Sequence, residues 1–160
     1  MATAPYNPPY QTVNFHFRIS FGANTSDIRF QSVTGLDSTI ETETVKEGGL
    51  NQFTHVVPVR RKYGPLVLKR GLLIADDSPV TQWLQQAFYD EIIVPMDTVM
   101  VSLLSDGNSV GSSSHDPMLS WTLGHVWPLS WKIGELNAET GAVLIETLEL
   151  NYNTLVMDRV

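Results

Sequence analysis

Alternation along residues 119–133 restricts this chain to a fold rich in β-strands. Every second position there holds a large or ring-bearing residue: Leu119, Trp121, Leu123, His125, Trp127, Leu129, Trp131 and Ile133. A period of two places one face of a strand against a core. Pro128 has no amide hydrogen, so we expect a bulge or edge position there and two strand segments joined at a bend. Residues 13–21 show the same alternation and predict another strand with one buried face.

One segment has helical spacing instead. Ser78 can cap a helix that begins at Pro79, and its apolar stripe would comprise Val80, Trp83, Leu84, Ala87 and Phe88. Further strands are expected over 28–34, 66–74, 92–94, 98–104 and 142–156. We therefore predict a mainly β fold, an antiparallel β-barrel or sandwich with one flanking α-helix. A single domain should span 12–160, after a flexible N-terminal arm at 1–11 that contains three prolines.

A polar hairpin over residues 40–59 has no evident partner within the chain. It turns at residues 47–51, where paired glycines allow the positive φ of a tight reversal. Neither arm alone has a consistently apolar face, since the first carries Glu41 and Glu43 on one side and Thr42 and Thr44 on the other. Isolated hairpins are marginal in water, and exposed strand edges pair with other chains. We expect this hairpin to complete a sheet shared between subunits.

Composition excludes several classes of protein. The chain has 160 residues, a formal net charge of −7 and no cysteine. The acidic charge argues against direct nucleic-acid recognition, which needs cations against phosphates. The absence of cysteine excludes disulfides and thiolate metal sites. The start of the chain lacks the pattern of a secretory signal, and no apolar run reaches the roughly 20 residues of a spanning helix, so we expect folding in a cytosol and no membrane insertion of the subunit.

Candidate catalytic and ligand motifs are weak. Ser114, His115 and Asp116 have the residue types of a hydrolytic triad, but three neighbours in sequence do not ordinarily point at one another. The four histidines lack the spacing of a metal site, and no glycine-rich segment has the lysine of a phosphate loop. Glu146 and Glu149 would lie on opposite faces of a strand, so we interpret them as surface or inter-subunit residues rather than an acid and base pair. We predict no enzyme activity and no cofactor.

Tryptophans on a β-sandwich could also form a platform for sugars. Trp121, Trp127 and Trp131 share the alternating positions with leucines, however, and Trp83 lies in the helical stripe. Burial in a core or an interface is the interpretation that we favour. A carbohydrate-binding module stays open as an alternative from a different class.

Four segments, taken in order, resemble the tail tube proteins of contractile phages and of phage-tail-like contractile injection systems. They are Phe30-x-x-Val33-x-Gly35-Leu36, Glu47-Gly48-Gly49-x-Asn51, Leu68-Lys69-Arg70-Gly71 before the helix with Trp83, and Trp127-Pro128 leading to Glu146-Thr147-Leu148-Glu149-Leu150. The resemblance covers about residues 13–156. It implies a tail-tube (Hcp-like) β-barrel with a flanking helix.

The resemblance also implies a function in assembly. Six copies would close into a ring, and rings would stack into a hollow ejectable tube, the inner tube of a contractile injection system or phage tail. Implied partners are other copies of the chain, a contractile sheath protein, baseplate and tail-terminator or cap proteins, and an effector or DNA as cargo. Assembly in a bacterial cytoplasm into a virion tail, or into an extracellular or cell-anchored particle, would follow. The hexameric tube protein of type VI secretion is the alternative within this class.

We assign two sets of residues to assembly. Six of the ten basic residues lie in the hairpin and the next strand, so we expect several of them at subunit boundaries. The residues of the inter-subunit and ring-stacking hairpin would be Glu47, Gly48, Gly49, Asn51, Arg60, Arg61 and Lys62. Glu41 and Glu43 would face the lumen and present a hydrated surface to cargo.

Overall fold

The computed structural model describes residues 17–22, 30–45, 54–73, 78–104, 117–137, 141 and 143–159. The predicted arm at 1–11, the hairpin turn with Glu47, Gly48, Gly49 and Asn51, and the loop with Ser114, His115 and Asp116 lie outside these residues. The described part has eight strands and one helix, in agreement with the predicted mainly β class.

Six strands form one antiparallel sheet in the order β1-β6-β7-β8-β5-β2. The bounds are β1 Phe17–Phe21, β2 Ser32–Thr34, β5 Leu66–Gly71, β6 Met96–Leu104, β7 Pro117–Ile133 and β8 Ile145–Arg159. β7 and β8 pair with each other over almost their whole length. The first half of β7 also pairs with β6, and the first half of β8 also pairs with β5. The two long strands therefore run through both halves of the sheet.

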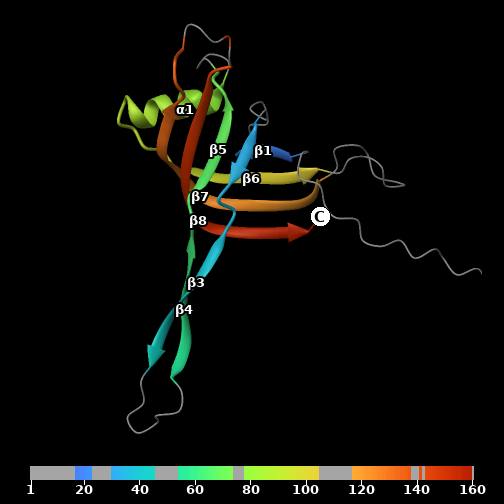
Figure 1. Ribbon diagram of the computed structural model, residues 1–160, viewed down its shortest axis with the longest axis vertical. Helices are drawn as coiled ribbons and strands as arrows, with labels where there is room; N and C mark the ends of the chain where they lie inside the picture. Colours follow the sequence, from blue (N-terminus) through green and yellow to red (C-terminus); the bar gives the residue numbers. More distant parts are fainter. Residues whose placement is uncertain are drawn as a thin grey trace, which may run out of the picture.

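A sharp bend in β7 and β8 curls this sheet (Figure 1). Leu123 opposite Leu155 and Val126 opposite Tyr152 all pack in or against the core, so the inward-facing position changes parity in both strands between these pairs. His125 has φ +54 at this point. A Cβ at Gly124 would lie 2.4 Å from Thr154 Oγ1, so glycine permits the close approach of the two strands here.

At the bend, the predicted alternation of buried and exposed side chains along residues 119–133 breaks down. His125 and Leu129 are exposed, as is Ile133, although the alternation places all three on the inward face with the tryptophans. The register shifts between Pro128 and Ser130, as expected from the proline, and the additional irregularity at His125 was not expected. The prediction of one apolar face along 119–133 is therefore wrong beyond Leu123.

Helix α1, Pro79–Phe88, begins where the sequence predicts. The Ser78 hydroxyl accepts a hydrogen bond from the Thr81 amide at 3.1 Å, and proline occupies the first turn. Val80, Trp83, Leu84 and Ala87 are buried, whereas Phe88 at the end of the predicted stripe is exposed. The helix covers one part of the curled sheet, as Figure 1 shows.

One core lies between α1 and the concave side of the sheet. It combines residues from β1, β5, β6, β7, β8 and α1, namely Ile19, Phe21, Leu66, Leu68, Val80, Trp83, Leu84, Val99, Val101, Leu123, Val126, Leu148, Leu150 and Tyr152. Trp121 and Trp131 pack against it. Burial of these side chains is the main source of stability for the fold.

Residues 92–94, predicted as a strand, are not one. Ile92, Ile93 and Val94 are exposed in an irregular segment between α1 and β6. The Trp83 indole N–H donates a 2.7 Å hydrogen bond to the Val94 carbonyl, which holds the segment against the helix. A short β-branched run is thus fixed by a side chain rather than by a neighbouring strand.

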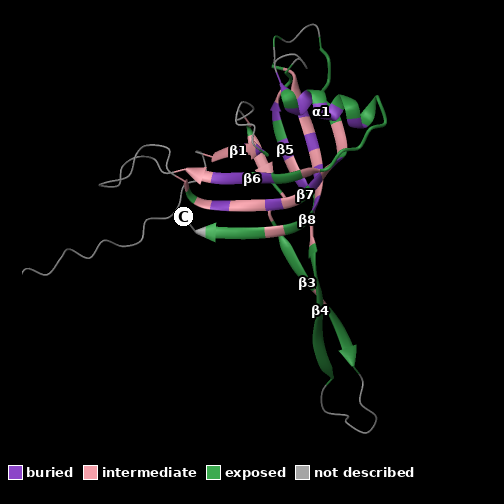
Figure 2. Cartoon of the chain, turned by 180° about the vertical axis from the view of Figure 1, so that it is seen from behind, coloured by how far each residue is buried: buried purple, intermediate pink, exposed green. Residues whose placement is uncertain are grey.

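The remaining two strands form a separate hairpin. β3 Ser38–Val45 and β4 His55–Tyr63 pair only with each other among the described residues. Figures 1 and 2 show this hairpin projecting from the body of the molecule, exposed over nearly its whole length.

Candidate assembly surfaces

The register of the hairpin gives it two different faces. Paired residues on antiparallel strands project to the same side. One side combines Ile40 with Arg61, Thr42 with Pro58 and Thr44 with Val56; the other combines Thr39 with Lys62, Glu41 with Arg60, Glu43 with Val57 and Val45 with His55. We call these the apolar face and the charged face. A bulge between Glu41 and Thr42 shifts the register and brings Pro58 and Val56 of β4 opposite the threonines.

The apolar face is a property of the pair of strands. Ile40 is 56% exposed and Val56 is 61% exposed, so neither side chain is covered by its own chain. Neither arm alone has a consistently apolar face, which is why the sequence did not indicate this one. An uncovered apolar surface on a projecting element is typical of a contact with another chain.

An exposed ion pair crosses the charged face. The Arg60 guanidinium donates to the Glu41 carboxylate at 2.5 Å. This hydrogen bond, with the positive charge of Arg60, lowers the pKa of Glu41, and the same contact raises the pKa of Arg60. The pair is open to solvent, so it sets the local charge pattern more than the stability of the hairpin.

The predicted site residues are intermixed on this hairpin. Glu41 and Glu43, assigned to the lumen, share the charged face with Arg60 and Lys62, assigned to subunit boundaries, whereas Arg61 lies on the apolar face. The two assigned sets therefore do not form two separate surfaces. Their roles in an assembly stay predictions.

A tyrosine anchors the base of the hairpin to the sheet. The Tyr152 hydroxyl of β8 donates a 3.1 Å hydrogen bond to the Gly35 carbonyl, just before β3, and the Tyr152 ring lies 5.4 Å from the ring of Tyr63 at the end of β4. Burial, with the nearby negative charge of Asp37 and with Tyr63, raises the pKa of Tyr152 to about 12. Sequence reasoning missed this residue, because only the fold brings residue 152 to residue 35.

Gly35 is required where the chain enters the hairpin. Its φ is +89, and a Cβ there would lie 2.0 Å from the Pro65 carbonyl oxygen. Pro65 is in the connection between β4 and β5, so both connections of the hairpin are packed against each other at this glycine.

A buried polar cluster joins α1 to three strands. The Arg70 guanidinium donates to one Glu146 oxygen, and the Trp131 indole donates to the other at 2.7 Å. Arg70 also donates to the Thr81 hydroxyl at 2.7 Å. The Arg70 and Glu146 side chains are 1% and 0% exposed. The interpretation of Glu146 as a surface or inter-subunit residue is therefore wrong.

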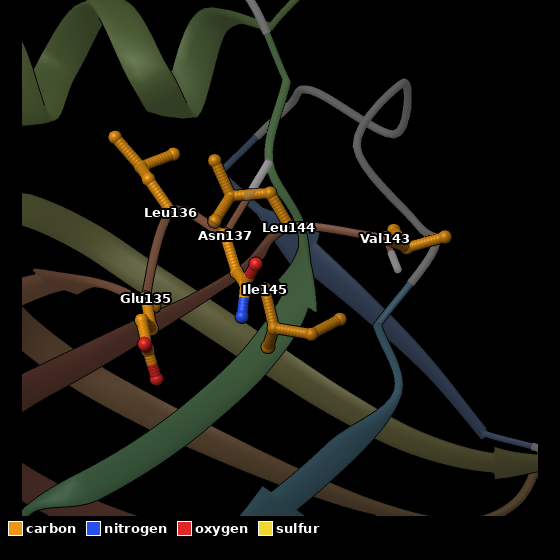
Figure 3. A pocket seen from close by; sticks show the side chains of 7 residues that line it. Glu135, Leu136, Asn137, Val143, Leu144 and Ile145 are labelled. Carbon is orange, nitrogen blue, oxygen red and sulfur yellow. The ribbon is translucent and has the colours of Figure 1, made fainter. Parts of the chain in front are cut away.

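A shallow apolar end lies where β7 ends and β8 begins. A cavity of about 260 Å³ is lined by residues 134–137 and 143–145. Figure 3 shows the side chains of Leu136, Val143 and Ile145 set around it. Leu136 is 80% exposed and Val143 is 75% exposed, and Glu135 is the one acidic side chain among these lining residues. We call this surface the turn end.

Two other kinds of site are absent from the described residues. No helix in this part of the chain has the length and apolar character to cross a membrane. No group of three or more histidine, aspartate or glutamate side chains in the same residues is placed to hold a metal ion.

A curled antiparallel sheet, one flanking helix and a projecting hairpin define a β-barrel-like tube fold. A family model described as the T4-like virus tail tube protein gp19 matches residues 13–156. The chain therefore belongs to the tail tube protein family, whose members are structural proteins. Comparison with curated proteins gives no match.

Solved structures agree with this family. A chain in the cryo-EM structure of the anti-feeding prophage baseplate, 6-fold symmetrised, is 31% identical with a TM-score of 0.77, over 96% of this chain and 98% of that chain. A chain in the sheath-tube complex of an extracellular contractile injection system, PVC, is 18% identical with a TM-score of 0.77, over 96% and 95% of the two chains. Hcp1 from Flavobacterium johnsoniae is 11% identical with a TM-score of 0.56, over 91% and 97%. The last two likenesses concern the fold alone.

Proposed function

We propose that this protein is a structural subunit of the inner tube of a contractile injection system or phage tail. Six copies close into a ring, and rings stack into a hollow, ejectable tube. The observation that carries the proposal is the β3–β4 hairpin, which projects from the body and has no third strand among the described residues. Family membership and the 31% identical relative from a 6-fold symmetrised baseplate structure support it.

Ring closure gives the hairpin the partner that it lacks. Strand edges that pair with neighbouring copies leave no open lateral edge, whereas the faces across the axis stay available for stacking. On the charged face, Glu41 and Glu43 would be turned to the lumen and keep water on the wall that cargo slides along.

Partners follow from the same proposal. The related solved chains come from structures described as a baseplate, a sheath-tube complex, a sheath and tube terminator and a cap. For this chain we propose contacts with a sheath, a baseplate and a terminator, and assembly in a bacterial cytoplasm before incorporation into a virion tail or an injection particle. The tube of type VI secretion is the second candidate, and its lower TM-score of 0.56 favours the first.

Negative-stain microscopy with mass measurement over a concentration series tests the proposal. We expect hexameric rings at low concentration and tubes at high concentration. The matched comparison is the triple variant Arg60→Glu, Arg61→Glu and Lys62→Glu, which should shorten or abolish tubes because it replaces three cations of the hairpin by anions in an acidic chain. A wild-type protein that stays monomeric at every concentration would contradict the proposal.

A further inference from the structure

Two complementary surfaces lie at opposite ends of the molecule. In Figure 1, β3 and β4 extend from the body toward one end of the longest axis, and the ends of β7 and β8 that flank residues 134–137 and 143–144 lie toward the other. Figure 2 shows the same arrangement from behind. Because the two surfaces are so far apart, they cannot meet within one chain, but they can meet between two copies stacked head to tail.

The apolar character of the two surfaces matches. The apolar face of the hairpin exposes Ile40 and Val56, with Pro58 between them in the register. The turn end exposes Leu136 and Val143 beside its cavity. Both surfaces would lose apolar area to water on contact, which is the usual driving force for association.

Among the described residues, the apolar face has one positive charge and the turn end has one negative charge. Arg61 lies on the apolar face opposite Ile40, whereas Arg60 on the other face is paired with Glu41. Glu135 is exposed at the turn end. Neither Arg61 nor Glu135 has an ion pair with any residue in the described ranges. A single charge within an apolar contact fixes the orientation and register of the partner.

We propose that the apolar face of the hairpin docks on the turn end of a second copy in the next ring, with Arg61 placed against Glu135. This inference rests on the proposed tube function and names the contact that stacks the rings. The contact joins different surfaces of identical chains, so it repeats without closing and extends a tube indefinitely.

A charge exchange tests the pairing. Arg61→Glu and Glu135→Arg should each leave hexameric rings intact and shorten the tubes at least threefold, because each places like charges together. The double variant should restore at least half of the wild-type length. Asp158→Arg, at the far end of β8, changes the charge equally and should leave the length within a factor of two. Tube lengths come from electron micrographs, and thermal unfolding verifies that each variant is folded.

Cross-linking provides a second readout that does not depend on charge. The chain has no cysteine, so Ile40→Cys with Leu136→Cys introduces the only two thiols. A bis-maleimide reagent should give a ladder of covalent multimers in tubes, and at least tenfold less product in isolated rings.

The possible results distinguish a failure of this proposed contact from a failure of the proposed tube function. Full-length tubes from either single charge variant, no recovery in the double variant, or equal cross-linking in isolated rings would overturn the contact while the tube function stood. Absence of rings and tubes in the wild-type protein would overturn both.

Discussion

Two glycines with positive φ differ in what surrounds them, and the difference predicts their tolerance to alanine. Gly22, at φ +57, has no atom of the described residues within 4 Å of the position of an alanine methyl group, whereas a Cβ on Gly35 would meet the Pro65 carbonyl oxygen at 2.0 Å. Gly22→Ala should cost only the backbone strain of about 1–2 kcal/mol. Gly35→Ala should lower the free energy of unfolding by about 1–3 kcal/mol more, because the chain must also relieve an overpacked contact.

Chemical denaturation of the two variants checks this prediction, with Gly22→Ala as the matched control. Equal losses in the two variants would show that the contact with Pro65 relaxes at no cost. The connections at the base of the hairpin would then be looser than their packing indicates.

The raised pKa of Tyr152 predicts that the folded protein loses stability at high pH. Its pKa in the folded protein, about 12, lies above its ordinary value of 10.0, so the folded state favours the neutral phenol. Its contribution is therefore complete below about pH 10 and is lost as the pH rises from about 10 to about 12. Tyr152→Phe should flatten this part of the profile of unfolding free energy against pH.

Tyr89→Phe, which removes a phenol exposed on the surface, is the control for general effects of alkali. At neutral pH, Tyr152→Phe should cost about 1 kcal/mol, since the Gly35 carbonyl loses its donor. An unchanged alkaline slope in Tyr152→Phe would argue against this anchor of the hairpin.

At the scale of elements, the buried cluster joins α1 to the sheet. Arg70 on β5 lies directly opposite Glu146 on β8, and Thr81 on α1 and Trp131 on β7 complete the set of hydrogen bonds. Glu146→Gln should lower the free energy of unfolding by about 3–5 kcal/mol, because it removes the buried carboxylate charge that is paired with the Arg70 guanidinium.

The matched control is Glu149→Gln, on the same strand but the opposite face. Glu149 accepts from the exposed Lys132 at 2.6 Å in a pair that solvent reaches, so its loss should cost less than about 1 kcal/mol. Denaturant unfolding measures both variants, and tryptophan fluorescence should change only in Glu146→Gln, where a single carboxamide oxygen replaces the two carboxylate oxygens that accept from Arg70 and Trp131. Similar losses in the two variants would mean that the cluster contributes little.

Local signals predicted the elements whose structure depends on neighbours in sequence. The cap at Ser78 and the proline at position 79 located the start of α1 to the residue, and the alternation of 13–21 indicated β1. Signals of this kind act within one turn or one strand, so the sequence contains all that they need.

Features that depend on the pairing of two strands could not be predicted from such local signals. The parity change near His125 occurs in β7 and β8 together, and neither strand alone indicates it. Ile92 and Ile93 have strand propensity but no strand beside them. The apolar face of the hairpin needs the register and bulge of two strands, and the burial of Glu146 needs Arg70 from a strand 76 residues away in sequence.

At the scale of the whole molecule, different interactions stabilise the compact body and the projecting hairpin. The body has a continuous core of fourteen buried residues from five strands and the helix. The hairpin has an exposed ion pair and an exposed apolar face, and it is fixed to the body by Tyr152 and by the packing around Gly35. We expect the hairpin to be the part whose stability depends most on neighbouring copies.

The passage of β7 and β8 through both halves of the curled sheet has a mechanical consequence. A thrust applied where β7 ends and β8 begins travels along hydrogen-bonded backbone to the opposite side of the body, without crossing a loop. Paired strands loaded along their length share the force among many hydrogen bonds at once. A tube built from such subunits would therefore resist buckling. Its deformation under load would be concentrated at the contacts between subunits.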